Sequence, residues 1–175
     1  MCVIIYKPAG VEMPSNEILF ECYSANRDGM GFATPNKTYH SLSYSQFMGR
    51  LKGVKKSEPC IIHFRWATHG SVKLANCHPF KKGDVTFAHN GVLDIASKND
   101  KTDSEIAFVN IIYPAIEING FRSKEADRVI SETAGVSRFA IMKGRDVELF
   151  GNWFKVQGCL FSNLNWQRFS SYFKY

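Results

Sequence analysis

Long apolar runs are missing from this sequence. The longest uninterrupted run is Met1–Tyr6, whereas a helix that spans a membrane needs about 20 apolar residues. The same run is too short for a secretory signal, whose apolar core has about 7–15 residues and follows a basic segment. We therefore expect no membrane segment and a cytoplasmic location.

Paired cysteines and grouped metal ligands are also missing. The five cysteines are an odd number and form no Cys-x-x-Cys pair, so the sequence indicates neither a disulfide framework nor a zinc ribbon. Four of the five histidines lie in the stretch from His63 to His89, but they form no His-Glu-x-x-His motif and lack helical spacing. We expect reduced thiols, no metal ion and no cofactor.

Basic residues are in excess but are not grouped. Lysine and arginine number 22 against 16 acidic residues, which gives a net charge of +6. No stretch of about five to eight basic residues and no nucleic-acid-binding motif occurs, so we expect no dedicated nucleic-acid binding. The 13 glycines and 6 prolines are too few for a low-complexity chain. No repeat or linker divides the 175 residues, which predicts one domain, 1–175.

The order of the predicted elements favours an α+β fold. β-Branched and aromatic runs predict strands at 3–6, 31–33, 60–66, 85–89, 138–142, 147–150 and 158–161. Helical spacing predicts helices at 16–23, 43–52, 103–112 and 122–132, with a break near Pro114. Because strands precede and follow the helices without regular alternation, we expect antiparallel sheets covered by helices.

Cys2 directly follows the initiator methionine. If Met1 is removed, this residue carries a thiol, with an ordinary pKa of about 8.5, and a free α-amine, with a pKa of about 7.7–8.0. One residue then supplies both a nucleophile and a base, as in N-terminal nucleophile enzymes. The alternative is a buried strand cysteine, because the residues that follow are apolar.

Arg65 ends the most clearly alternating strand. The run 60–66 places Cys60, Ile62 and Phe64 on one face and Ile61, His63 and Arg65 on the other. An arginine at a strand end can bind a carboxylate through two parallel hydrogen bonds, and Thr68 and His69 add donors in the loop that follows. The alternative is a surface arginine beside a core tryptophan.

Two further segments carry polar groups at the ends of predicted elements. In His89-Asn90-Gly91, a side-chain amide beside a glycine N–H makes a pair of donors for an oxyanion; the alternative is an ordinary Asn-Gly hairpin turn. Asp103, which precedes an apolar helix, can bind a substrate ammonium. The alternative is a helix N-terminus with favourable acidic charge.

Taken together and in this order, six segments resemble the class II glutamine amidotransferases, whose glutaminase domain is an N-terminal nucleophile hydrolase. The likeness is greatest to the stand-alone subgroup, which has no fused synthase domain. The resemblance covers about residues 2–110 and implies a four-layer αββα fold. The segments that carry it are Cys2 after Met1, 27–32, 63–70, 76–80, 87–91 and 102–105.

The resemblance also implies a role for each candidate residue. Cys2 would attack the side-chain amide of glutamine while its α-amine moves the proton, and ammonia and a glutamyl thioester would form first. Water would then release glutamate. Further roles are oxyanion binding by Asn90 and the Gly91 N–H, α-carboxylate binding by Arg65, α-ammonium binding by Asp103, and lining of the same pocket by Thr68 and His69.

Several points leave other functions open. The best-known family members carry a second domain that consumes the ammonia, so we expect either a synthase partner that accepts it or a glutaminase alone. The short loop 94–99 also admits another γ-glutamyl or small amide substrate. If Met1 is retained, the α-amine is displaced, and the chain would be a binding module without catalysis.

Overall fold

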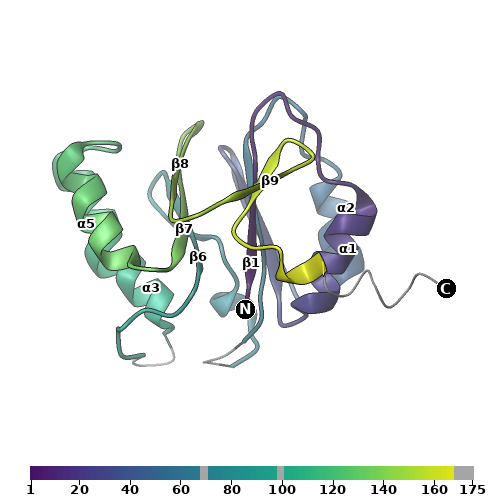
Figure 1. Cartoon of the computed structure of the whole chain (residues 1–175), viewed down its shortest axis with the longest axis horizontal. Coiled ribbons are helices and arrows are strands. Elements are labelled where there is room, and N and C mark those ends of the chain that lie inside the picture. The colour runs from purple at the N-terminus through teal and green to yellow at the C-terminus, as the bar shows by residue number, and fades with distance from the viewer. Residues whose placement is uncertain (68–70, 98–100, 168–175) are drawn as a thin grey trace.

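The computed structural model describes residues 1–67, 71–97 and 101–167. Two antiparallel sheets pack face to face, and helices cover the outer face of each (Figure 1). The predicted α+β class and the implied four-layer αββα arrangement are therefore confirmed. Among the described residues, no helix is both long enough and apolar enough to cross a membrane.

The larger sheet has six strands in the order β3-β2-β4-β1-β10-β9. Strand β1, which begins one residue after Cys2, lies inside this sheet and pairs with β4 and β10. The strands are β1 (Val3–Lys7), β2 (Met30–Thr34), β3 (Lys37–Ser41), β4 (Cys60–Phe64), β9 (Phe154–Val156) and β10 (Cys159–Phe161).

The smaller sheet has four strands in the order β5-β6-β7-β8. They are β5 (Phe80–Lys82), β6 (Val85–Asn90), β7 (Arg138–Lys143) and β8 (Asp146–Phe150). Strands β1 and β6 face each other across the space between the sheets. The N-terminal end of the chain and the end of β6 thus come close together.

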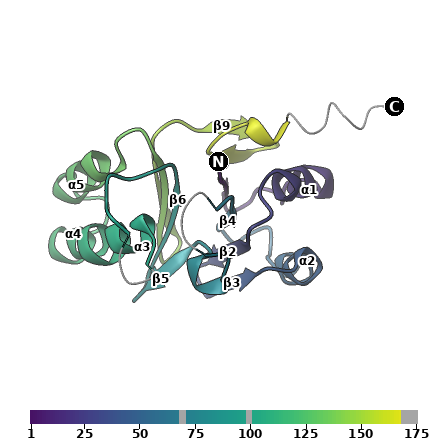
Figure 2. The ribbon, with the colours of Figure 1, turned by 90° about the horizontal axis from the view of Figure 1, so that it is seen from below.

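Helices form the two outer layers (Figure 2). The six-stranded sheet is covered by α1 (Asn16–Ala25) and α2 (Tyr44–Leu51). The four-stranded sheet is covered by α3 (Asp103–Ala107), a π-helical turn η2 (Phe108–Ile112), α4 (Tyr113–Asn119) and α5 (Lys124–Ala134). A short 3₁₀ turn, η1 (Leu74–Asn76), precedes β5.

Alternation along the strands explains the layers. In β4, Ile62 and Phe64 pack under α1 and α2, whereas Ile61 packs between the sheets with Ile4 and Ala88. Each side of a buried strand therefore meets a different apolar core. The faces predicted for the run 60–66 are confirmed.

Local signals set most helix boundaries. Ser15 caps α1 and accepts a hydrogen bond from the Ile18 N–H, and Ser123 and Thr102 cap α5 and α3 in the same way. Such caps satisfy N–H groups that have no partner inside the helix.

One local prediction was wrong, and one alternative is not observed. The helix that starts at Asp103 does not break near Pro114 but continues through η2 into α4, in which Pro114 is the second residue. The wider π-helical turn η2 directly precedes this proline, which has no N–H to donate to the turn before it. The Asn90-Gly91 pair does not close a hairpin, since the chain leads from β6 to α3. Strands β3, β5 and β9 were not predicted.

Candidate active site

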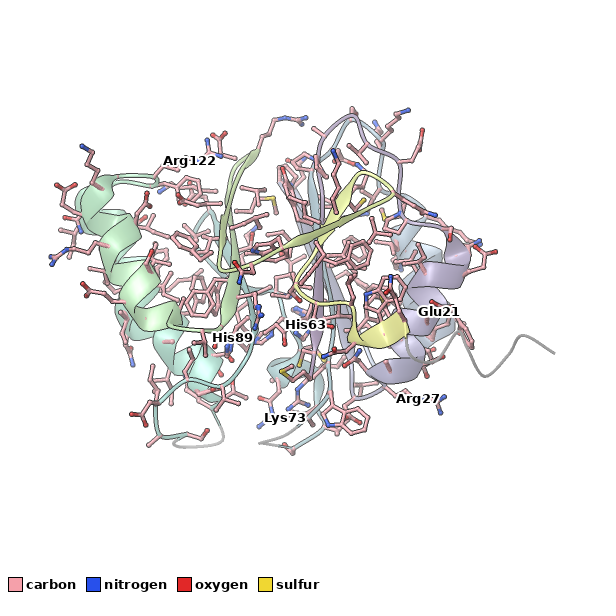
Figure 3. All side chains as sticks on the ribbon, in the orientation of Figure 1. Glu21, Arg27, His63, Lys73, His89 and Arg122 are labelled. Carbon is pink, nitrogen blue, oxygen red and sulfur yellow. The ribbon has the colours of Figure 1, made fainter. Side chains whose placement is uncertain are left out.

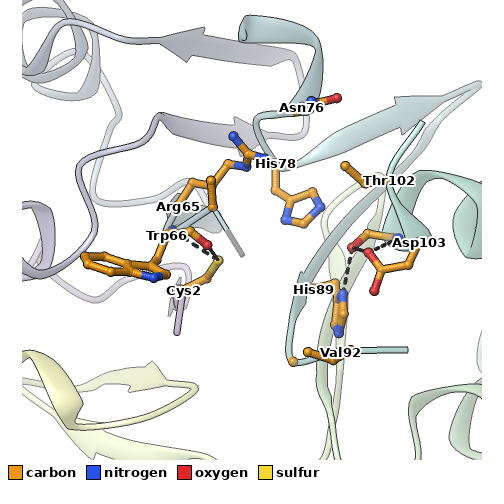
Figure 4. Close-up of a pocket in the computed structure, with 12 residues that line it drawn as sticks. Cys2, Arg65, Trp66, Asn76, His78, His89, Val92, Thr102 and Asp103 are labelled. Atoms are coloured by element: carbon orange, nitrogen blue, oxygen red, sulfur yellow. Dashed lines mark hydrogen bonds between the residues drawn. The ribbon is translucent and has the colours of Figure 1, made fainter. Parts of the chain in front are cut away.

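A pocket opens at the end of the interface between the two sheets (Figure 4). One wall is lined by Cys2, which directly precedes β1, and by Arg65 and Trp66, which directly follow β4. The opposite wall is lined by His89 and Asp103, from the end of β6 and the start of α3 (Figure 4). The fold therefore brings residues that are about 100 positions apart in the sequence to one cavity.

Cys2 is the one cysteine of the five that is not fully buried. Its Sγ accepts a hydrogen bond from the Trp66 N–H at 3.3 Å, and the thiol lies 3.5 Å from the Trp66 carbonyl oxygen. Burial raises the pKa of the Cys2 thiol, so the protonated form prevails at neutral pH. A base is therefore needed to generate the thiolate. The predicted alternative of a core cysteine does not fit a side chain that lines a pocket.

Arg65 lies directly after β4 and is only 5% exposed. Its N–H donates to the Gly29 carbonyl at 2.8 Å, its carbonyl accepts from the Asp28 N–H at 3.0 Å, and its Nη1 donates to the Ser71 carbonyl at 3.2 Å. Asp28 Oδ2 also accepts from the Ala67 N–H at 2.8 Å. The loop that holds Asp28 and Gly29 thus fixes the backbone on both sides of the arginine.

The end of β6 contributes Gly91, but not Asn90, to the lining of the pocket. Gly91 lines the pocket and has a φ of 151°, a region that favours glycine. A Cβ on Gly91 would overlap the side chain of Ser137 and would lie 3.1 Å from His89 Nε2. Asn90 is buried, and its Nδ2 lies 2.8 Å from Ser162 Oγ. Position 91 therefore has no room for a side chain.

Asp103 occupies the first position of α3, and its carboxylate has three donors around it. Oδ2 accepts from the Leu93 N–H at 3.0 Å, and Oδ1 accepts from the Ser104 N–H at 2.7 Å. Oδ1 also lies 3.1 Å from Ser104 Oγ, which in turn lies 2.7 Å from His89 Nδ1. The helix N-terminus that the sequence offered as an alternative is present, and the same carboxylate lines the pocket.

Three buried histidines lie beside the pocket. His78 Nδ1 and His63 Nε2 are 3.1 Å apart, and Figure 3 shows His63 and His89 inside the molecule, whereas Arg27 and Arg122 lie at its outside. Burial lowers the pKa of His63 to about 3 and that of His89 to about 4, and it holds the pKa of His78 well below its usual value. All three are therefore neutral near pH 7, and they add no positive charge to the pocket.

The described residues contain no group of three or more side chains of the metal-ligating types that is placed to hold a metal ion. Thr68 and His69, which the resemblance places in the same pocket, lie outside the described residues.

Three residues near the site were not found from the sequence. Asp28 lies in a segment that carried the resemblance, but its contact with Ala67 had no signal of its own. Ser162 and Asn163 follow β10, and Asn163 Nδ2 donates to the Cys2 carbonyl at 2.8 Å. No motif marks these two residues, because their contacts are formed only when the chain's two ends come together.

Comparison with known proteins places the chain in a family. A family model described as class II glutamine amidotransferases matches residues 24–137. The glutamine–fructose-6-phosphate aminotransferase of Lactococcus lactis is 35% identical over 101 residues, which are 50% of this chain and 16% of that protein. The enzyme of the same name from Xanthomonas campestris is 28% identical over 100 residues, with the same two shares.

Solved structures share the fold at low identity. Glutamine phosphoribosylpyrophosphate amidotransferase from B. subtilis has a TM-score of 0.59 at 17% identity, over 92% of this chain and 41% of that chain. A structure described as the allosteric regulatory enzyme of purine biosynthesis has a TM-score of 0.60 at 16% identity, with the same shares. The chain spans less than half of each of these relatives. Because the family model covers more than half of the chain, the chain belongs to the class II glutamine amidotransferases.

Proposed function

We propose that this chain hydrolyses the side-chain amide of glutamine to glutamate and ammonia, with Cys2 as the nucleophile. Removal of Met1 frees the α-amine of Cys2, which takes the thiol proton as Sγ attacks the amide carbon. The tetrahedral intermediate collapses as the C–N bond breaks, the proton passes to the leaving ammonia, and a thioester remains. Water then attacks the thioester and releases glutamate and the thiol.

The raised pKa of the Cys2 thiol supports the need for this base. A thiol that is protonated at neutral pH attacks slowly unless a nearby group accepts its proton. The Gly91 N–H and the Asn90 amide would bind the oxyanion of the tetrahedral intermediate. Removing one such donor costs on the order of 10²–10³ in rate.

The observation that carries the proposal is the placement of opposite charges on the two walls of the pocket. Glutamine carries an α-carboxylate and an α-ammonium, and Arg65 and Asp103 line the same cavity as Cys2. We assign the carboxylate to Arg65 and the ammonium to Asp103, and the resemblance adds Thr68 and His69 to the pocket. Holding both ends of the substrate places its amide for attack.

The chain spans 16% of the length of the aminotransferases that it matches. We propose that residues 1–175 form one glutaminase domain and that a synthase partner consumes the ammonia. The cytoplasmic location stays a prediction of the sequence.

Two measurements on the purified protein test the function. Intact mass should show loss of Met1, and the processed protein should release ammonia from glutamine. Cys2→Ala should abolish this release, whereas Cys22→Ala, a substitution at a buried cysteine in α1, should retain it. Ammonia release from another γ-glutamyl amide but not from glutamine would reassign the substrate. Retention of Met1 with no hydrolysis would instead support a binding module.

A further inference from the structure

The segment that follows β10 is hydrogen-bonded to β1, the strand that begins directly after Cys2. The Ser162 N–H donates to the Ile4 carbonyl at 2.9 Å, and the Ile4 N–H donates to Ser162 Oγ at 2.9 Å. Asn163 Nδ2 donates to the Cys2 carbonyl at 2.8 Å. Ser162 is fully buried, so the end of β10 fixes the backbone beside Cys2.

The same hydroxyl reaches the other sheet. Ser162 Oγ lies 2.8 Å from Nδ2 of Asn90, the last residue of β6. Ala88 packs between the sheets, and by alternation Asn90 projects from the same face of β6. Ile4 also packs in the core between the sheets, and Cys2 lies two positions before it. One serine therefore joins the strand of the nucleophile to the proposed oxyanion residue.

At this contact one buried polar atom is left without a hydrogen-bond partner. Ser162 Oγ accepts from both Ile4 N and Asn90 Nδ2, while the buried Oδ1 of Asn90 has no partner. A serine hydroxyl has one hydrogen to donate, and a buried carbonyl oxygen is normally bonded. The amide oxygen and nitrogen have nearly the same shape, and their positions are assigned from the bonds that they make.

Turning the amide by 180° gives a partner to the Ser162 O–H and to Asn90 Oδ1. The Ser162 O–H then donates to Asn90 Oδ1, and Ser162 Oγ still accepts from the Ile4 N–H. Asn90 Nδ2 moves to the position of the oxygen that has no partner, so its two hydrogens are the groups left without a protein acceptor. A donor is what an oxyanion requires, whereas a carbonyl oxygen at that position would repel it.

We propose that Ser162 is a positioning residue that sets the orientation of the Asn90 amide, with Oδ1 toward Ser162 and Nδ2 toward the reacting carbonyl. The orientation follows from the hydrogen-bond count alone. Its effect on the reaction rests on the proposed glutaminase function.

Kinetics of variants test the effect on the reaction. Ser162→Ala should lower kcat for glutamine, by no more than the factor of about 10²–10³ expected for Asn90→Ala, and should leave KM unchanged because the ends of glutamine are bound elsewhere. In the double variant the two losses should be clearly less than multiplicative, because the part of the Ser162→Ala loss that acts through the amide is already absent in Asn90→Ala. Thr86→Val, which removes another buried hydroxyl from β6, should keep the wild-type kcat. A rise in KM alone, or losses that multiply in the double variant, would overturn the positioning role.

Neutron diffraction from deuterium-exchanged wild-type crystals tests the orientation without any assay or substitution. Its result stands even where the protein fails to hydrolyse glutamine or a variant fails to fold. We expect the Ser162 deuterium to point at Asn90 Oδ1 and both Nδ2 deuteriums to point away from Ser162. An Nδ2 deuterium directed at Ser162 Oγ would refute the proposal.

Discussion

Substitution of Ser104 by alanine tests how the ammonium end of the pocket is held. The hydroxyl of Ser104 lies between His89 Nδ1, at 2.7 Å, and Asp103 Oδ1, at 3.1 Å. In the variant the carboxylate keeps its two backbone donors, the N–H groups of residue 104 and Leu93. We expect the Asp103 carboxylate to stay near its place but to be less firmly oriented.

The magnitude follows from the bond that is lost. A hydrogen bond to a charged group contributes about 1.5–3 kcal/mol. Since two of the three donors remain, we expect the loss of glutamine affinity to be about 1–1.5 kcal/mol, which corresponds to an increase in KM of about five- to thirteenfold. The turnover number should change less than about twofold, because Cys2 and Gly91 are unaltered.

The assay compares glutamine with 4-carbamoylbutanoate, an amide of the same length without the α-amino group. In Ser104→Ala, KM for glutamine should rise while KM for the analogue stays the same. Ser131→Ala on the exposed face of α5 serves as the control and should change neither value. An equal rise for both amides would show that Ser104 does not act through the ammonium site, and the reasoning would be refuted.

Three further predictions concern strain, charge and buried hydrogen bonds. Gly91→Ala should lower Tm on the order of 5 °C and reduce activity, since the added Cβ meets Ser137 at a φ of 151°. Burial and the Asp127 carboxylate raise the pKa of Glu148 to about 7. Because the folded state then holds the proton more tightly than the unfolded state, stability falls as pH rises from 4.5 to about 7. Glu148→Gln should therefore raise Tm more at pH 8 than at pH 4. Lys7→Met should lower the free energy of unfolding by about 2–4 kcal/mol, measured by urea denaturation, because the buried Nζ donates to the Lys56 and Glu58 carbonyls at 2.8 and 2.7 Å.

The sequence predicted the parts of the fold that depend on local pattern. Alternation at 60–66 correctly separated the two faces of β4, and helical spacing predicted a helix at 16–23, where α1 extends over Asn16–Ala25. Strands β3, β5 and β9 were not predicted, because they are short or partly exposed and have no apolar run of their own. Their pairing comes from neighbouring strands rather than from intrinsic preference.

The residues of the candidate site could likewise be predicted only in part. The structure brings Cys2, Arg65, Gly91 and Asp103, each chosen from a local motif, to one pocket. Contacts made by the C-terminal residues could not be read, since Ser162 meets Ile4 and Asn90 only through the packing of two sheets. Hydrogen bonds between distant segments leave no periodic trace in a sequence.

Ammonia release from glutamine by the protein without Met1, compared with its Cys2→Ala variant, tests the central claim most directly. We predict steady release of ammonia and glutamate in equal amounts by the processed protein and none above background by the variant. Equal release by the two proteins, or no release by a protein whose mass confirms the loss of Met1, would contradict the assignment of Cys2 as the nucleophile of a glutaminase.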